Sequence, residues 1–176
     1  GIQALDLVGR KLGMKKGMYF MSLLGEMNAT VAAYQGKAAL ADLAADVQKA
    51  VNTLAEMAMY FAGSAKAGKF MIPVANAYPF LMLMGKVVMG WLLLWEAGVA
   101  REKLEGIASA KGVDLADGAK VSALAKSDAD AAFYVGKVSA ARYFIKHVLP
   151  EVDAAVTSIK SEDLSMIDIP EEAFAS

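Results

Sequence analysis

The chain has 176 residues, enough for one domain with a buried core. Its 18 Lys and Arg nearly balance 19 Asp and Glu, and a net charge of −1 gives no field that would recruit nucleic acid or an anionic membrane. The chain has no cysteine, which excludes disulfides and thiolate sites, and its 57% of hydrophobic residues is dominated by Ala, Leu, Val and Met, which favours helix.

The first residues lack the features of a targeting segment. The opening Gly1-Ile2-Gln3-Ala4-Leu5-Asp6 has no initiator methionine, no basic region and no continuous apolar core. A secretory signal peptide requires the last two. We therefore expect an internal cut in a longer polypeptide, and the lack of cysteine fits a cytoplasmic origin.

The first predicted helix covers residues 2–12. Its apolar side chains recur at helical spacing, at Ile2, Leu5, Val8 and Leu12. Asp6 and Arg10 lie four residues apart on another face, where they can form an ion pair. Four such apolar side chains are costly to leave in water. We expect this stripe to fold back onto the bundle or to drive self-association.

Two further helices are predicted in the next fifty residues. The second covers residues 20–34 and ends at Gly36, where we expect the left-handed backbone of a helix C-cap. The third covers residues 40–61 and is the most clearly amphipathic, because its apolar residues step by three and four. These residues are Leu40, Leu43, Val47, Val51, Leu54, Met57 and Phe61. Residues 63–69 predict a polar connection.

The fourth predicted helix, residues 79–109, is apolar on every side in its first half, which indicates a central position. Lys86 is the only charged residue in that half, so a membrane span is an alternative. Pro73 and Pro79 shorten the apolar helix to residues 80–95, whereas a span needs about 20 residues, and a central lysine costs roughly 3 kcal/mol. We expect a core helix and no membrane partner.

The remaining chain predicts a loop, a fifth helix and a tail. Residues 112–127 contain several helix-breaking Asp and Gly residues and predict a loop. The fifth helix begins at Asp128 and continues past Val148, and Pro150 must kink or split it. The tail, residues 162–176, has no long period and is expected to be extended. The fold class is therefore all-α, an antiparallel (up-and-down) bundle of about four main helices plus an N-terminal helix.

Residues suited to catalysis or metal binding are scarce. His147 is the only histidine, and its neighbours offer no group to orient it as a base, so we interpret it as a surface or interface residue. A zinc site needs several His or Cys ligands, and a di-iron bundle needs Glu-x-x-His motifs. The sequence has neither. Asp114-x-x-Asp117-Gly118 lacks the ligand pattern of a calcium loop. Four acidic pairs are interpreted as solvated helix faces: Asp42/Asp46, Glu102/Glu105, Asp128/Asp130 and Glu171/Glu172.

Methionine is frequent, with 11 residues in the chain. Because its side chain fills irregular shapes, we interpret most of these residues as core filling. The alternative is an independent helical bundle that binds a lipid or acyl group in a Met-rich interior.

Two parts of the sequence resemble one enzyme family. The opening run Gly1-Ile2-Gln3-Ala4-Leu5-Asp6-Leu7-Val8-Gly9-Arg10-Lys11-Leu12 is similar to the stretch that follows the Tyr-Glu-Gly-Thr motif of acyl-CoA dehydrogenases. Two later runs resemble the extra C-terminal domain of a larger bacterial branch, which includes enzymes acting on 3-methylthiopropanoyl-CoA. They are Ala75-Asn76-Ala77-Tyr78-Pro79-Phe80-Leu81-Met82-Leu83-Met84-Gly85-Lys86, and Phe133-Tyr134-x-Gly136-Lys137-x-x-Ala140-Ala141-Arg142-Tyr143-Phe144 followed by Leu149-Pro150.

The resemblance implies a non-catalytic C-terminal fragment of an FAD-dependent enzyme. In the family, the Glu of the missing motif removes the α-proton of an acyl-CoA while the flavin accepts the β-hydride. Residues 1–16 would end the dehydrogenase helical domain, residues 17–161 would form the accessory bundle, and residues 162–176 the tail. Gly1 departs from the Gln often found where the flavin contacts end, so at most its backbone reaches the cofactor.

The resemblance therefore assigns no catalytic, cofactor-binding or metal-binding residue to this chain. FAD and acyl-CoA belong to the inferred parent enzyme, and the implied partner is the upstream catalytic core of the same polypeptide, with a homodimer left open. Lys86, Lys137 and Arg142 lie on apolar helices. We interpret them as ion pairs within the bundle, with Glu96 or Asp130 as partners, and docking to the missing core is the alternative.

Overall fold

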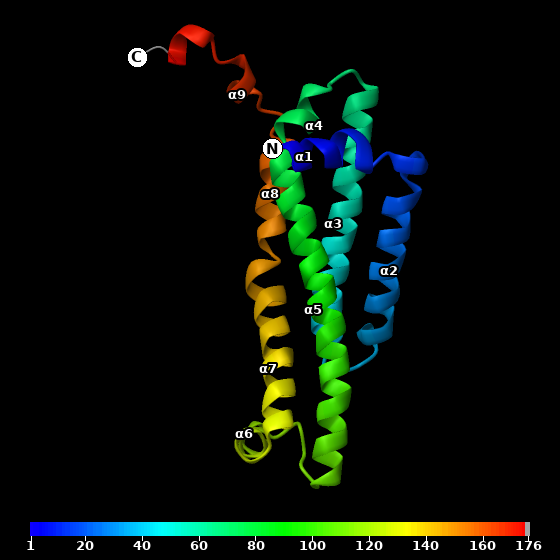
Figure 1. Cartoon of the computed structure of the whole chain (residues 1–176), viewed down its shortest axis with the longest axis vertical. Coiled ribbons are helices and arrows are strands. Elements are labelled where there is room, and N and C mark those ends of the chain that lie inside the picture. Colours follow the sequence, from blue (N-terminus) through cyan, green and yellow to red (C-terminus); the bar gives the residue numbers. More distant parts are fainter. Residues whose placement is uncertain (175–176) are drawn as a thin grey trace.

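The computed structural model describes residues 1–174, and its regular elements in that range are all helices. Figure 1 shows long helices lying side by side, with consecutive ones running in opposite directions. They are α2 (Met18–Gln35), α3 (Ala41–Lys66), α5 (Ala77–Ala110) and α7 (Ala129–Tyr143), which α8 (Glu151–Lys160) extends. The predicted all-α, up-and-down bundle is confirmed.

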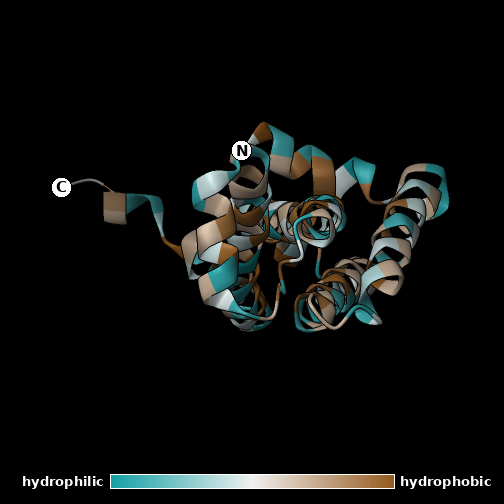
Figure 2. Ribbon diagram, turned by 90° about the horizontal axis from the view of Figure 1, so that it is seen from below, coloured by the Kyte–Doolittle hydropathy of each residue, from teal (hydrophilic) through white to brown (hydrophobic). Residues whose placement is uncertain are grey.

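The main core lies between these helices. Helix α3 buries the predicted stripe, including Leu43, Leu54 and Phe61. The aromatic ring of Phe61 packs against that of Phe80 of α5, with 5.1 Å between their centroids. Seen along the bundle, the apolar surfaces of the long helices face one another (Figure 2). Burial of such side chains is the main driving force that assembles the bundle.

Helix α5 begins two residues before the predicted start, because Pro79 lies in its first turn, where a missing backbone N–H removes no helical hydrogen bond. It contacts α2, α3, α7 and α8, as its apolar composition predicted. One stripe nevertheless remains exposed, at Met82, Met89, Leu92, Trp95 and Val99. By length and composition α5 could cross a membrane, although core helices of soluble proteins satisfy the same criterion.

Two glycines of α5 allow close packing. A Cβ on Gly98 would overlap the ring of Tyr34, which is buried against α5 from the last turn of α2. A Cβ on Gly90 would lie 3.1 Å from the side chain of Leu149. Because both positions lack a side chain, Tyr34 and Leu149 pack directly against the α5 backbone.

The first predicted helix is present but turned about its axis. Helix α1 (Ile2–Asp6) continues into a π-helical turn, η1 (Leu7–Lys11), and both cross one end of the bundle (Figure 1). Leu7 is buried in the main core, with Val8 and Leu12 packed beside it, whereas Ile2 and Leu5 are exposed. The segment folds back as predicted, and its buried face includes Val8 and Leu12 of the predicted stripe but takes Ala4 and Leu7 in place of Ile2 and Leu5.

The turn between this segment and α2 has an unusual backbone. In η2 (Met14–Gly17) the φ angles of Lys15, Lys16 and Gly17 are 51°, 57° and 83°, all left-handed. Side chains make this conformation cost roughly 1–2 kcal/mol per residue, and only glycine adopts it freely. The sequence predicted an interruption here, between Gly13 and Gly17, but not its handedness.

The connections around α3 differ from prediction. Gly36 ends α2 with a φ of −86°, so the expected left-handed cap is wrong. Helix α3 continues to Lys66 through much of the predicted polar connection, and Gly68 has a φ of 80° in the turn that follows. A short helix, α4 (Met71–Ala75), was not predicted, because Pro73 lies inside it.

The predicted loop at residues 112–127 is also wrong in its second half, which forms α6 (Gly118–Ser127). Asp117 is its N-cap, and its carboxylate accepts hydrogen bonds from the backbone N–H groups of Ala119 and Lys120, at 3.0 and 3.2 Å. A cap residue was thus interpreted as a helix breaker. Helix α6 covers a second, smaller core formed by Leu104, Ala108, Leu124 and Ala131.

Pro150 splits the fifth predicted helix, as expected. Helix α7 passes into a π-helical turn, η3 (Phe144–Val148), and α8 begins directly after the proline. The tail predicted to be extended contains two single turns, α9 (Ser165–Asp168) and η4 (Glu171–Phe174). Residues 175–176 of that tail lie outside the described residues.

Candidate functional site

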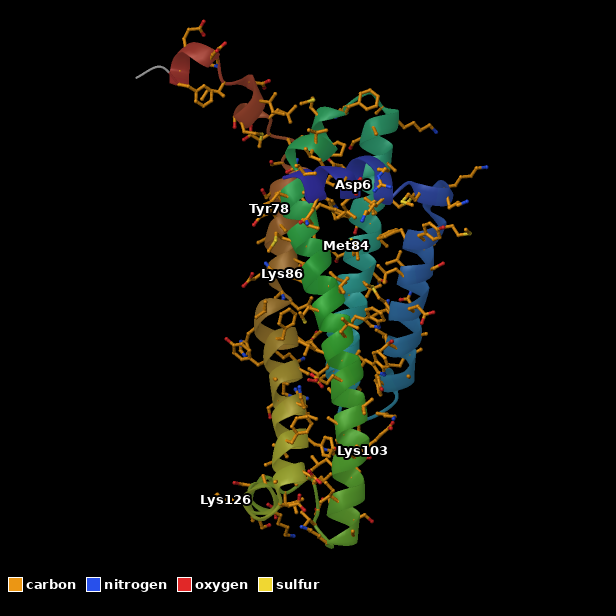
Figure 3. The ribbon with its side chains drawn as sticks, in the orientation of Figure 1. Asp6, Tyr78, Met84, Lys86, Lys103 and Lys126 are labelled. Atoms are coloured by element: carbon orange, nitrogen blue, oxygen red, sulfur yellow. The ribbon has the colours of Figure 1, made fainter. Side chains whose placement is uncertain are left out.

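The three basic residues on apolar helices form ion pairs within the bundle. The Lys86 ammonium lies 2.5 Å from the carboxylate of Glu151, and Lys137 lies 2.8 Å from Glu96 (Figure 3 labels Lys86). Arg142 donates two hydrogen bonds to the carboxylate of Asp42, at 2.8 and 3.1 Å. Of the two partners named from the sequence, Glu96 is confirmed, while Asp130 pairs with none of the three.

The pair of Arg142 belongs to a series that joins α3 to α7, η3 and α8. Four pairs follow one another along these helices: Asp42 with Arg142, Asp46 with Lys146, Lys49 with Asp153, and Glu56 with Lys160. We call this series the ion-pair ladder. The third pair has the opposite polarity, because there the lysine is on α3. Its pairs are partly exposed, so each contributes modestly to stability.

Charges in the ladder perturb one another. Hydrogen bonds from Arg142, together with those from Lys146, lower the pKa of Asp42 to about 2. The same carboxylate raises the pKa of Arg142, and a hydrogen bond to Asp46 raises the pKa of Lys146. A strongly perturbed carboxyl group can mark a catalytic acid or base, but here it is explained by a structural ion pair.

A small cleft lies against the ladder, with a volume of about 300 Å³. Its charged lining residues are Asp46, Lys49, Lys146 and Asp153, which are already paired with one another. No acid or base in the cleft is therefore left over from the ladder to act on a substrate.

Three residues of the other acidic pairs have structural partners: Glu102, Glu105 and Asp128. The remaining three, Asp130, Glu171 and Glu172, are exposed and form no ion pair with the described residues. Glu102 pairs with Lys37 and Glu105 with Arg101, at 2.6 and 2.8 Å. Asp128 pairs with Lys111 and also caps α7 through the backbone N–H of Ala131. The interpretation as merely solvated faces missed these contacts, two of which join residues far apart in sequence.

His147 is exposed near the end of η3, where its ring lies 5.0 Å from that of Tyr143. The predicted pair Asp6–Arg10 is confirmed, with 2.6 Å between its closest atoms. Within residues 1–174 there is no group of three or more His, Asp or Glu side chains that could hold a metal ion.

A larger apolar groove, of about 580 Å³, lies between the N-terminal segment, α2 and α3. Its walls include Leu12, Phe20, Met21 and Met59, and Lys16 is the one charged residue among those lining it. The pyrophosphate and ring edges of a flavin dinucleotide need several hydrogen-bond donors, which apolar walls do not provide. The groove therefore does not fit FAD.

The methionines divide between the interior and the surface. Met27 and Met57 are fully buried in the main core, as core filling predicts, whereas Met18, Met21 and Met59 are exposed. Met21 and Met59 line the open apolar groove, whereas the alternative function needs a Met-lined site in the interior of the bundle.

Comparison with known proteins identifies the family. Residues 23–170 match the family model described as acetyl-CoA dehydrogenase C-terminal like. Two butyryl-CoA dehydrogenases of Syntrophomonas wolfei subsp. wolfei are each 29% identical, over 175 and 173 residues, and the match covers 98% of this chain and 25% of theirs. The broad-specificity linear acyl-CoA dehydrogenase FadE5 of Mycobacterium tuberculosis is 27% identical over 180 residues, 98% of this chain and 26% of its own.

The chain thus spans about a quarter of the length of the curated relatives that it matches. The family model covers most of the bundle, and the relatives also match the N-terminal segment that precedes it. This chain belongs to the acetyl-CoA dehydrogenase C-terminal-like family.

Proposed function

We propose that this chain is the non-catalytic, helical C-terminal domain of an FAD-dependent acyl-CoA dehydrogenase. The observation that carries the proposal is the extent of the match, which takes in 98% of this chain but only a quarter of each dehydrogenase. The parent enzyme would form a double bond between the α and β carbons of an acyl-CoA. Its catalytic glutamate and most of its flavin contacts would precede Gly1.

The role of the domain would be to cover the catalytic core and shape contacts between subunits, with a homodimer as the simplest assembly. A helical framework suits such a role, and the ion-pair ladder adds modest contacts between α3 and the α7–α8 segment. We further propose a cytoplasmic location and, within the family, the branch that includes 3-methylthiopropanoyl-CoA dehydrogenases.

The proposal is tested by comparing residues 1–176 with the full polypeptide encoded by the gene. The full polypeptide should be yellow, bind FAD, and reduce an electron acceptor in the presence of an acyl-CoA, whereas chain 1–176 should be colourless and inactive. The codons immediately before Gly1 should encode Tyr-Glu-Gly-Thr. Stoichiometric FAD and turnover in the isolated chain, or a flavin-free full polypeptide, would refute the assignment.

A further inference from the structure

Exposed apolar side chains are distributed unevenly along the bundle. One end is formed by α1, α4 and the first turn of α5, and we call it the apolar end. Its large exposed side chains are Ile2, Leu5, Phe70, Met71, Val74 and Tyr78. Residues 100–132, which form most of the opposite end, contain no exposed large hydrophobic residue. Figure 3 shows Tyr78 near one end and Lys126 at the other.

The elements that form the apolar end are neighbours. Helix α1 contacts α5, while α4 contacts both η1 and α5. Ile2, Phe70 and Tyr78, which these elements bring to one end, are 86%, 63% and 61% exposed. Single exposed apolar residues are normal on a monomer, whereas several gathered in one region are typical of an interaction site.

The N-terminus lies at this same end (Figure 1). Gly1 precedes the most exposed apolar side chain of the surface, Ile2. Any polypeptide attached before Gly1 must therefore begin beside the apolar end and meet it at high effective concentration. A second copy of the chain has no such tether.

Some of the basic side chains near the surface have no ion-pair partner. Residues 1–22 and 60–80 contain six basic residues, of which Arg10 and Lys11 lie near Asp6, and Lys69 pairs with Glu162 of the acidic tail at the same end. The other three, Lys15, Lys16 and Lys66, form no ion pair with the described residues. Because complementary charge steers association and selects partners, the occupant should place Asp or Glu opposite these three lysines.

We infer that the apolar end is the surface on which the preceding polypeptide of the parent enzyme packs, through an apolar patch with an acidic rim. The inference rests on the proposed function, because it takes the occupant to be the three quarters of the relatives' length that this chain does not match. Beyond the proposed function, it specifies which face of the domain contacts the preceding polypeptide.

Hydroxyl-radical footprinting of the full polypeptide and of chain 1–176 tests the inference. Labelling of Phe70, Met71 and Tyr78 should fall at least five-fold in the full polypeptide, because packing excludes water from them. Trp95 and Phe133 are 53% and 58% exposed on another face and serve as internal controls whose labelling should stay the same. Unchanged labelling at the apolar end, or protection of Trp95 and Phe133 instead, would overturn the inference.

Surface variants separate docking from folding. The triple variant Phe70→Ser, Val74→Ser, Tyr78→Ser should increase tryptic cleavage after Lys15 and Lys16 in the full polypeptide by about ten-fold, while chain 1–176 with the same changes melts as the wild type does. The matched control, Met89→Ser, Trp95→Ser, Phe133→Ser, should leave cleavage unchanged. Equal cleavage in the triple variant and the wild type would contradict docking. Flavin content is measured separately, so a failure of the proposed activity is distinguished from a failure of docking.

Discussion

Among the glycines, Gly98 has the least room for a side chain. A Cβ there would overlap the ring of Tyr34, which is itself buried. We expect Gly98→Ala to lower the free energy of unfolding by about 1–3 kcal/mol, since the ring must leave its site. Urea denaturation followed by circular dichroism measures the change.

The matched control for this prediction lies on the same helix. A Cβ on Gly106 would have no other atom within 4 Å. Gly106→Ala should therefore leave the free energy of unfolding unchanged or raise it by up to about 1 kcal/mol, because alanine has the higher helix propensity. Adding Tyr34→Leu to Gly98→Ala should recover part of the loss, because the two changes are coupled. Equal effects of the two glycine variants would show that the overlap is relieved at no cost.

The carboxylate of Asp42 should give the protein a specific response to acid. Its pKa is lowered to about 2, so the stability that it contributes is complete above its ordinary value of 3.8 and disappears as the pH falls toward 2. Both Asp42 and Arg142 are nearly half exposed, and screening limits the contribution to about 1 kcal/mol or less. Asp42→Asn should therefore be less stable than the wild type at pH 7.

That difference between Asp42→Asn and the wild type should shrink between pH 4 and pH 2. Urea denaturation of both proteins at several pH values measures this difference in stability. Glu26→Gln is the control, because Glu26 is exposed on α2 and the described residues form no ion pair with it. A difference that persists unchanged at pH 2 would mean that charge on Asp42 is not its source.

At the scale of elements, α6 should open independently of the long helices. It covers a small core of its own around Leu124, which is 4% exposed, and this cluster is separate from the main core. Leu124→Ala should destabilise that unit by about 2–5 kcal/mol. Hydrogen exchange should accelerate at residues 118–131, while the central amides of α3 keep their protection.

Ser122→Ala, an exposed change on the same helix, is the control for the α6 prediction. It should leave exchange in α6 nearly unchanged. If Leu124→Ala instead accelerated exchange equally in α3 and α6, the two cores would form a single cooperative unit.

The same elements show what the sequence could predict. Apolar spacing predicted α2, α3 and α5 to within a few residues at most boundaries, because each buries a long stripe. It failed for α6, where Asp117 caps a helix but is also a residue typical of loops. It failed again at α1, where burial of Leu7 rather than Leu5 depends on contacts with α4 and α5 that no local pattern encodes.

For the whole molecule, the ion-pair ladder favours one alignment of α3 with the α7–α8 segment. Because one pair is reversed, a shift that carried Lys49 from Asp153 toward Lys146 would bring two lysines together. Lys49→Glu should lower the melting temperature by a few degrees, and Asp153→Lys added to it should restore most of the loss. Scanning calorimetry at low and high salt measures both.

Salt provides the control for this exchange of charges. In 1 M salt the Lys49→Glu variant and the double variant should melt close together, because partly exposed pairs are screened. Failure of the double variant to recover at low salt would assign the loss to packing of the lysine stem.

Of the long-range ion-pair partners, only Glu96 could be predicted from the sequence, since partners on separate helices depend on register.

The left-handed turn at Lys15, Lys16 and Gly17 has a consequence for how this gene can change. Two lysines hold a backbone that glycine or asparagine would hold at lower energy. The fold should therefore tolerate substitution of Lys15 or Lys16 by glycine or asparagine. Valine or isoleucine at either position should destabilise the turn and be removed by selection. Lysines that persist at both positions across descendants would then reflect selection on their charge.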